Sequence, residues 1–342
     1  MSKRVLLTGG AGFIAHHVID FLLNNTDWEI VSLDRLDFSG NLNRLADLLA
    51  EADPDVKKRI KVVYHDLKAE ISPLTRSMIG RVDYIYHLAA GSHVDRSIEF
   101  PMEFVMDNVV GTANLLEYAR KVDQLELFVN FSTDEVFGPA PHGVFYKERD
   151  RYNSTNPYSA TKAGAEELCV AWQNTYKMPI YITHTMNVFG ERQHPEKYIP
   201  MCIKRVRDAE KISIHSDPTR TIPGSRHYIH AKDVAEGLYF ITTMKGFEST
   251  LDYGGAHCPK FNLVGKEEVN NLEVAQIIAD AQGKELNYEL VDFHSARPGH
   301  DLRYALSGDY MRKLGWEPRV SLRERLGQVV DWTLKHNNWL KN

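Results

Sequence analysis

The first half of the chain alternates between two hydrophobic patterns. Short apolar runs rich in β-branched residues are followed by longer segments in which apolar residues recur every three or four positions. The runs that predict strands are Arg4–Thr8, Glu29–Leu33, Ile60–His65, Val82–His87, Leu125–Ser132 and Pro179–His184. Strands separated by helical segments are typical of β-α-β units, so these six runs predict one parallel sheet covered by helices.

Beyond about residue 190 this alternation becomes less regular. Prolines interrupt it at Pro195, Pro200, Pro218, Pro223 and Pro298, which predicts short elements joined by loops. The last apolar pattern, over Leu322–Leu340, predicts an amphipathic helix. We therefore expect an α/β fold, with a doubly wound parallel Rossmann sheet in residues 1–186 and a smaller mixed α/β region in residues 187–342. Some elements of the second region are expected to return to the sheet.

Composition and charge exclude several classes of protein. The chain has 342 residues, and 41 Lys and Arg against 46 Asp and Glu give a net charge of −5. Nucleic-acid binders are normally basic over a domain or a face, so no nucleic-acid partner is expected. The first apolar run, residues 5–8, is too short for a signal-peptide core or a membrane span, so no membrane partner is expected either.

The cysteines and histidines predict neither a disulfide framework nor a metal site. Cys169, Cys202 and Cys258 lie far apart and form no C-x-x-C pair, which favours a reducing cytoplasm. His16 and His17 are adjacent, and neighbouring helical residues do not share a face, so they cannot chelate one ion together. No H-E-x-x-H pattern is present in the sequence.

A glycine-rich turn follows the first predicted strand. Residues 8–15 read Thr-Gly-Gly-Ala-Gly-Phe-Ile-Ala and open the first predicted helix. Glycine permits the tight turn and lets backbone N–H groups approach a pyrophosphate at the positive end of the helix. The third small position is Ala15 instead of glycine, a change of one methyl group. The turn therefore predicts a dinucleotide site.

Acidic residues after the next two strands refine this prediction. Asp34 ends the second strand, where a carboxylate accepts hydrogen bonds from the adenosine ribose and repels a 2′-phosphate. We therefore expect NAD, although the neighbouring Arg35 leaves NADP open. Asp66, after the third strand, either contacts the adenine ring or is a solvated turn aspartate.

Tyr158 and Lys162 stand four residues apart at the start of a predicted helix, hence on one face. A nearby ammonium favours the ionised phenol, so that a tyrosine can act as a base near neutral pH. The Y-x-x-x-K spacing alone is a weak signal. Its position downstream of the glycine turn gives it weight.

Together these motifs resemble the extended short-chain dehydrogenases/reductases, and within them the nucleotide-sugar 4,6-dehydratases, whose best-known members act on dTDP-glucose. The resemblance runs nearly end to end. It is carried by the glycine turn and by residues 87–97, 132–138, 158–162, 193–197 and 297–301. It implies an NAD-binding, catalytic first region and a mainly nucleotide-sugar-binding second region.

The resemblance also implies roles for individual residues. The catalytic set would be Thr133, Asp134, Glu135, Tyr158 and Lys162. The cofactor would contact Gly9, Gly12, Phe13, Ile14, Asp34, Asp66, Leu67, Leu88, Ala89, Ala90, Tyr158 and Lys162. Loss of water across C5 and C6 of a hexose needs a base and an acid, and two adjacent carboxyl groups in different environments can divide these roles. Asp134 and Glu135 are therefore the pair that distinguishes a dehydratase from a simple epimerase.

For the substrate, the resemblance implies contacts with Ser92, His93, Thr133, Asn187, Glu196, Lys197, Arg226, Asn262, Arg297 and His300. Either arginine could instead form a surface salt bridge, and Asn262 could instead cap a turn. Val188, Glu191 and Gly91 depart from the usual family pattern, and residues 217–224 form a longer stretch than usual. These departures leave the nucleotide base and the hexose open.

Two other functions compete with a dehydratase. A nucleotide-sugar epimerase or decarboxylase on the same scaffold would keep Tyr158 and Lys162 without using Asp134 and Glu135 for elimination. A non-catalytic dinucleotide-sensing protein commonly lacks the tyrosine or the lysine, and both are present here. The resemblance further implies a homodimer formed through two helices of each subunit.

Overall fold

A computed structural model of the chain describes residues 2–37, 39–244, 258–292 and 302–341. The chain forms two compact units. The first, which we call the sheet unit, comprises residues 1–136, 156–184 and 235–261, and the second unit comprises residues 137–155, 185–234 and 262–342. Each unit is assembled from three separate stretches of chain. The functional roles predicted for residues 1–186 and 187–342 stay predictions.

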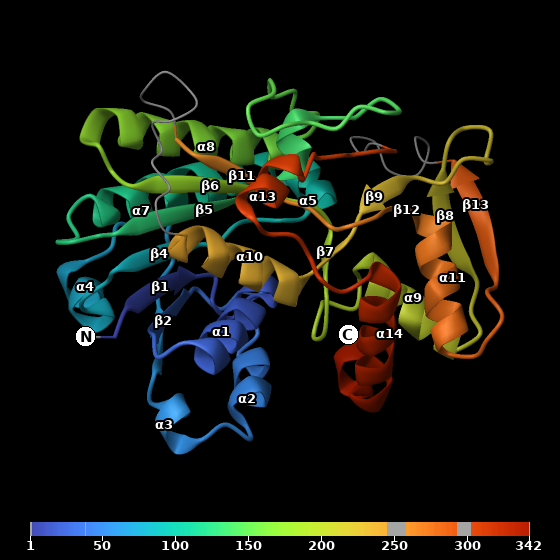
Figure 1. The fold of residues 1–342 in the computed structure, drawn as a ribbon, viewed down its shortest axis with the longest axis horizontal. Coiled ribbons are helices and arrows are strands. Elements are labelled where there is room, and N and C mark those ends of the chain that lie inside the picture. Colours follow the sequence, from blue (N-terminus) through green and yellow to red (C-terminus); the bar gives the residue numbers. More distant parts are fainter. Residues whose placement is uncertain (1, 38, 245–257, 293–301, 342) are drawn as a thin grey trace. The chain divides into compact units, whose positions relative to one another are not determined.

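The sheet unit is built on a seven-stranded sheet with the order β11-β6-β5-β4-β1-β2-β3 (Figure 1). The strands are β1 (Arg4–Thr8), β2 (Glu29–Asp34), β3 (Ile60–Tyr64), β4 (Tyr84–His87), β5 (Leu127–Thr133), β6 (Ile180–Thr185) and β11 (Lys260–Leu263). The pairs β1–β2, β2–β3, β1–β4 and β4–β5 are all parallel. All six predicted strands are present, and β11 adds a seventh from the C-terminal half.

The strand order reverses between β1 and β4, and the loops after these two strands leave the sheet side by side at the carboxyl ends of the strands. Chain order runs from β1 toward β2 and β3 on one side, and from β4 toward β5 and β6 on the other. In open parallel sheets, ligands bind at such a switch point, beyond the carboxyl ends of the strands.

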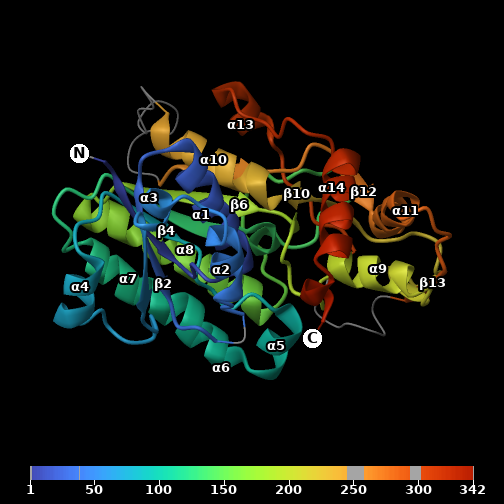
Figure 2. The same cartoon turned by 90° about the horizontal axis from the view of Figure 1, so that it is seen from below.

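Helices cover both faces of this sheet. Figures 1 and 2 show α1 and α10 on one face and α7 and α8 on the other. The helical elements are α1 (Phe13–Asn25), α2 (Asn43–Leu49), α3 (Pro54–Lys57), α4 (Pro73–Ile79), α5 (Val94–Glu99), α6 (Pro101–Phe104), a π-helix (Val105–Val110), α7 (Gly111–Ala119), a 3-10 helix (Asp134–Phe137), α8 (Pro157–Tyr176) and α10 (Ala231–Thr243). Burial on both faces explains the apolar strands, since Leu6, Ile85 and Phe128 are fully inaccessible to solvent.

Among its described residues, the second unit contains three two-stranded sheets, four α-helices and one 3-10 helix. The pairs are β7 (Val188–Phe189) with β10 (Ile229–His230), β9 (Ser225–His227) with β12 (Glu268–Asn270), and β8 (Ile212–Ser216) with β13 (Tyr288–Asp292). The helices are α9 (Tyr198–Arg207), α11 (Asn271–Ala281), α13 (Asp309–Leu314) and α14 (Leu322–Lys335). The predicted terminal helix thus ends at Lys335, and a 3-10 helix (Asn337–Leu340) follows it.

Among the described residues, the structure has no disulfide bond and no cluster that could hold a metal ion. Cys169, Cys202 and Cys258 are all free and buried. No group of three His, Cys, Asp or Glu side chains in the described ranges is arranged to hold a metal ion. Within the same ranges, no helix has both the length and the apolar character needed to cross a membrane.

Candidate active site

The glycine turn forms a backbone cradle between β1 and α1. Gly9 has φ +71°, and a Cβ at this position would lie 2.9 Å from backbone atoms of Ala89. The Gly12 N–H donates to the Gly9 carbonyl at 2.8 Å, and α1 begins at the next residue. The residue at the N-cap of α1, Gly12, has no side chain that could bond the first N–H groups of the helix. The backbone geometry therefore fits a pyrophosphate, which needs glycine for close approach and a helix N-terminus for charge.

Asp34 is held in place at the end of β2. Its carboxylate accepts hydrogen bonds from the Ala11 N–H at 3.0 Å and from the Leu36 N–H at 2.7 Å. The backbone passes closely at Gly40, where a Cβ would lie 2.6 Å from the Asp34 Oδ1. Burial lowers the pKa of the nearby Arg44 guanidinium to about 10, and Asp34 opposes this shift. The carboxylate is thus fixed beside the glycine turn, as a ribose acceptor must be.

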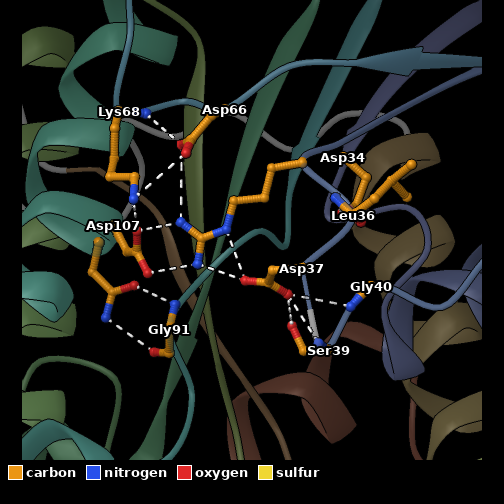
Figure 3. A network of polar contacts seen from close by, with 11 residues as sticks. Asp34, Leu36, Asp37, Ser39, Gly40, Asp66, Lys68, Gly91 and Asp107 are labelled. Atoms are coloured by element: carbon orange, nitrogen blue, oxygen red, sulfur yellow. Dashed lines mark hydrogen bonds and ion pairs between the residues drawn. The ribbon is translucent and has the colours of Figure 1, made fainter.

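The other predicted cofactor residues of the sheet unit also lie just beyond the carboxyl ends of the strands. Leu88, Ala89 and Ala90 directly follow β4, while Phe13 and Ile14 form the first turn of α1. Asp66 and Leu67 follow β3 on the far side of β2. Asp66 forms ion pairs with Lys68 at 3.5 Å and with Arg35 at 3.9 Å (Figure 3). Its Oδ1 also accepts from the Lys68 N–H at 3.0 Å, as a turn aspartate does. Its contact with adenine stays a prediction.

Tyr158 and Lys162 lie on the first turns of α8, which a capping box begins. The Asn156 side chain accepts from the Ser159 N–H at 2.8 Å, and the Ser159 hydroxyl accepts in return from the Asn156 N–H. The Lys162 Nζ donates to the Phe131 carbonyl of β5 at 2.7 Å. This bond holds the ammonium against the strand that carries the acidic pair.

Burial acts on the pKa values of both groups. It lowers the pKa of Lys162 to about 8, while the carboxylate of Glu166 acts in the opposite direction. Burial raises the pKa of Tyr158, and the charges of Glu135 and Asp134 raise it further, whereas a hydrogen bond with Thr133 lowers it. Tyr158 therefore needs an additional positive charge nearby before its phenolate form is favoured near neutral pH.

The acidic pair lies at the carboxyl end of β5 and is connected to α8. The Thr133 Oγ1 donates to the Asp134 Oδ1 at 3.0 Å, and the Asn156 Nδ2 donates to the Glu135 Oε2 at 3.2 Å. Asp134 is buried, whereas Glu135 is only half-buried. The two carboxyl groups therefore occupy different environments, and the predicted catalytic residues form one cluster within the sheet unit.

Sequence reasoning missed a buried carboxylate beneath this cluster, that of Glu166. It lies one helical turn beyond Lys162 and is completely inaccessible to solvent. Its oxygens accept from the Ser132 hydroxyl of β5, from the His184 Nε2 of β6 at 3.1 Å, and from the Lys260 Nζ of β11 at 3.3 Å. Burial opposes ionisation, yet His184, Lys260 and Ser132 together lower the pKa of Glu166 to about 2. The four-residue spacing from Tyr158 through Lys162 was the available signal.

Asn108 and Ser97 also support the cluster and were not foreseen. The Asn108 amide bonds the Gly91 N–H at 2.8 Å, the Gly91 carbonyl at 3.1 Å and the Thr161 hydroxyl at 3.0 Å. The Ser97 hydroxyl accepts from the Tyr158 N–H at 3.1 Å. These bonds tie the loop after β4 to the start of α8. No local sequence pattern marks either residue.

The predicted substrate residues are divided between the two units. In the sheet unit, Ser92 is exposed, and His93 is half-buried at the start of α5. In the second unit, Asn187 and Glu196 are exposed, and Lys197 directly precedes α9. Arg297 and His300 lie outside the described residues. These contacts stay predictions.

Arg226 and Asn262 both have partners within the second unit. The Arg226 guanidinium lies 4.8 Å from the centre of the Tyr304 ring and donates to the Ser225 carbonyl at 2.7 Å. The Asn262 amide donates to the carbonyls of Tyr146 and Ser307, each at 3.1 Å. The Arg226 guanidinium is thus held by stacking and by a backbone carbonyl, and the Asn262 amide joins two backbone segments. Their contacts with a substrate stay predictions.

Comparison with known proteins identifies the family. The sequence profile of a family described as GDP-mannose 4,6 dehydratase matches residues 6–329. The chain belongs to this family. It is 33% identical to dTDP-glucose 4,6-dehydratase of Shigella flexneri, over 99% of this chain and 95% of that protein. These matches confirm the predicted family and the hydro-lyase class of the dehydratase.

Solved structures agree with this assignment. DesIV, a dTDP-glucose 4,6-dehydratase from Streptomyces venezuelae crystallised with NAD and TYD bound, is 33% identical, with a TM-score of 0.83 over 99% of both chains. It confirms the predicted α/β fold and agrees with NAD as the cofactor. UDP-glucuronic acid 4-epimerase from Bacillus cereus has a TM-score of 0.82 at 23% identity, over 98% of this chain and 100% of that chain. The fold is thus shared with epimerases, and the residues of the site must distinguish the two activities.

The buried Glu166 cluster predicts a specific dependence of stability on pH. Since the pKa of Glu166 in the folded protein, about 2, lies below its ordinary value of 4.5, the ionised carboxylate stabilises the fold above about pH 4.5. This contribution is lost as the pH falls toward 2. Glu166→Gln should lower the free energy of unfolding at pH 7 by about 3–5 kcal/mol, because His184 and Lys260 lose their anion. The difference in unfolding free energy between Glu166→Gln and the wild type should decrease as the pH falls from about 4.5 to about 2.

Urea unfolding at a series of pH values measures this difference. Glu167→Gln changes the neighbouring, exposed glutamate of α8 and is the matched control, which should follow the wild-type curve. A Glu166→Gln deficit that stayed constant from pH 7 to pH 2 would contradict an ionised carboxylate at this position.

Proposed function

We propose that this chain is an NAD-dependent enzyme that converts a nucleoside-diphosphate hexose, with dTDP-glucose as the first candidate, into the 4-keto-6-deoxy sugar. The observation that carries the proposal is the bond from Asn156 to Glu135. It joins the acidic pair after β5 to the helix that bears Tyr158 and Lys162. An epimerase needs the tyrosine and the lysine but has no elimination for the acidic pair to catalyse.

The first chemical step belongs to Tyr158. Its phenolate removes the proton of the C4 hydroxyl, and the hydrogen bond with Thr133 favours the phenolate form. Lys162 supplies positive charge on the same face of α8, and its Nζ is held by the bond to the Phe131 carbonyl. A bound NAD would supply the acceptor for the hydride from C4 and the donor for C6, so that its redox state would be unchanged over the cycle.

Elimination then falls to the two carboxyl groups. The C4 ketone acidifies the proton at C5, and Glu135 takes that proton. C5 is protonated again when hydride adds to C6, which gives the 4-keto-6-deoxy sugar. Glu135 suits a base because it is only half-buried and its oxygen accepts a hydrogen bond from the Asn156 amide. We assign to the buried Asp134 the protonation of the departing C6 hydroxyl. By family resemblance, we assign the diphosphate to Asn187 and Arg226.

Substitution of the acidic pair tests this division of roles. Asp134→Asn and Glu135→Gln should each slow release of the keto sugar by about 100- to 10,000-fold, because one proton transfer is lost in each. Oxidation at C4 should continue, so reduced nicotinamide should accumulate on the enzyme. Rapid mixing followed by nicotinamide absorbance and product mass measures both steps.

Asp123→Asn is the matched control, since Asp123 is an exposed aspartate in the loop that enters β5 from its other end. It should retain wild-type rates. If both active-site variants released keto sugar at the wild-type rate, the assignment would be wrong. A product of unchanged mass from the wild type would favour the epimerase instead.

We also propose that the protein works as a cytoplasmic homodimer. Exposed apolar side chains supporting this occur on successive helical elements of the sheet unit, namely Ile98, Phe100, Met102 and Met106. Met102 is 67% exposed, and several exposed apolar side chains in one segment are typical of a protein interface, whereas a single one is not. Burial of such side chains is the main source of free energy in homodimer interfaces.

A charge placed in this segment should weaken the dimer. Met102→Glu should shift the mass in sedimentation equilibrium from two chains toward one. Leu74→Glu places the same charge at an apolar residue of α4 that is 72% exposed, and should leave the mass unchanged. If Met102→Glu and Leu74→Glu had the same mass in sedimentation equilibrium, this surface would not be the interface.

A further inference from the structure

Arg35 is enclosed by carboxylates that come from three different parts of the sheet unit (Figure 3). Its Nε donates to the Asp37 Oδ2 at 2.8 Å, and its Nη2 donates to the Asp107 Oδ2 at 2.8 Å. The Nη1 completes a two-pronged bond with the other oxygen of Asp107 and lies 3.9 Å from Asp66. All three nitrogens of the guanidinium therefore face carboxylates.

Asp107 is the strongest of these partners. It comes from the π-helix, 72 residues beyond Arg35, and its side chain is only 11% exposed. Paired parallel bonds between arginine and a carboxylate are stronger and more directional than single ones. The hydrogen bond with Asp107 is also the main cause of the raised pKa of Arg35. Asn108, the next residue, is bonded to Gly91 and Thr161, which fixes the helix that carries Asp107.

The position of Arg35 gives this enclosure a consequence for the cofactor. Asp34 faces the ribose position, and an arginine near that acid is the residue that accommodates a 2′-phosphate in NADP-binding sites. Here three cations, Arg35, Lys68 and Arg44, stand among four carboxylates, those of Asp34, Asp37, Asp66 and Asp107. A dianionic 2′-phosphate would meet a net negative charge and no available guanidinium fork.

We propose that Asp107, assisted by Asp37, is a specificity-determining residue that sequesters Arg35 and thereby makes the dinucleotide site select NAD over NADP. The inference rests on the proposed use of a dinucleotide and goes beyond it, because it assigns the selection to a residue outside the glycine turn and the β2 terminus. It requires that removal of Asp107 free Arg35 for the 2′-phosphate.

Competitive occupancy measures the selection without turnover. The full-length protein, stripped of dinucleotide, is equilibrated with equal concentrations of NAD and NADP. Unbound cofactor is then removed, the protein is denatured, and the released dinucleotides are quantified by chromatography and mass spectrometry. The wild type should release NAD almost alone, and Asp107→Asn should raise the NADP-to-NAD ratio at least tenfold.

Two further variants separate the proposed cause from a general change of charge. Glu103→Gln removes one negative charge from an exposed residue one turn before Asp107, and should keep the wild-type ratio. Arg35→Ala combined with Asp107→Asn should abolish the gain, because the freed guanidinium is what binds the phosphate. Asp37→Asn, which frees the Nε, should raise the ratio in the same direction and serves if Asp107→Asn does not fold.

The outcomes distinguish the two proposals. An unchanged ratio in Asp107→Asn protein that still binds NAD, or a gain that persists without Arg35, would overturn the inference alone. A folded wild-type protein that binds neither dinucleotide would overturn the proposed function as well.

Discussion

The candidate active site depends on one side chain, that of Asn156. Its oxygen caps α8 by accepting from the Ser159 N–H, and its nitrogen donates to Glu135. A single amide thus sets the start of the helix that carries Tyr158 and Lys162 and orients the acidic pair after β5. Substitution of a capping residue typically costs about 1 kcal/mol in stability. Substitution of Asn156 would also remove the bond that joins Glu135 to the helix carrying Tyr158 and Lys162.

The proposed chemistry needs the positive charge of Lys162, and this side chain lies in the interior of the sheet unit. Lys162 is buried, which by itself disfavours its cationic form. The ionised Glu166 counters that effect from one turn further along α8, and it is itself held by Ser132, His184 and Lys260 from three strands. Such a network is costly to disturb, because removal of Glu166 would take the anion from the largely buried Lys260 ammonium and the acceptor from Ser132 and His184. The geometry of Lys162 is therefore linked to the order of the strands.

Local patterns predicted the parts of this architecture that depend on short stretches of sequence. The strands followed from apolar runs, and the start of α8 was predicted at Tyr158 and Lys162. The structure shows that Asn156 caps this helix and that Pro157 is its first residue. The pairings across the sheet could not be predicted in this way. Lys260 reaches Glu166 only because β11 lies beside β6, and Asp107 reaches Arg35 from 72 residues away. Neither pairing leaves a mark on neighbouring residues.

The same limit explains how Arg35 was interpreted. From the sequence, an arginine after Asp34 left NADP open, because its partners were unknown. In the folded chain its guanidinium is bonded to Asp37 and Asp107. For Asn262, conversely, the sequence suggested a substrate contact or a turn cap, and its amide is committed to two backbone carbonyls. Partners decide what a polar side chain can do, and partners are set by tertiary structure.

The central claim is that one hydride leaves C4 and returns to C6 of the same sugar while water is lost between them. A nucleotide hexose with deuterium at C4, incubated with the purified protein and NAD, tests this directly by mass spectrometry and NMR of the product. The account predicts a product lighter by one water molecule that carries the deuterium at C6. A product of unchanged mass, or a dehydrated product from which the label has been lost to solvent, would contradict it.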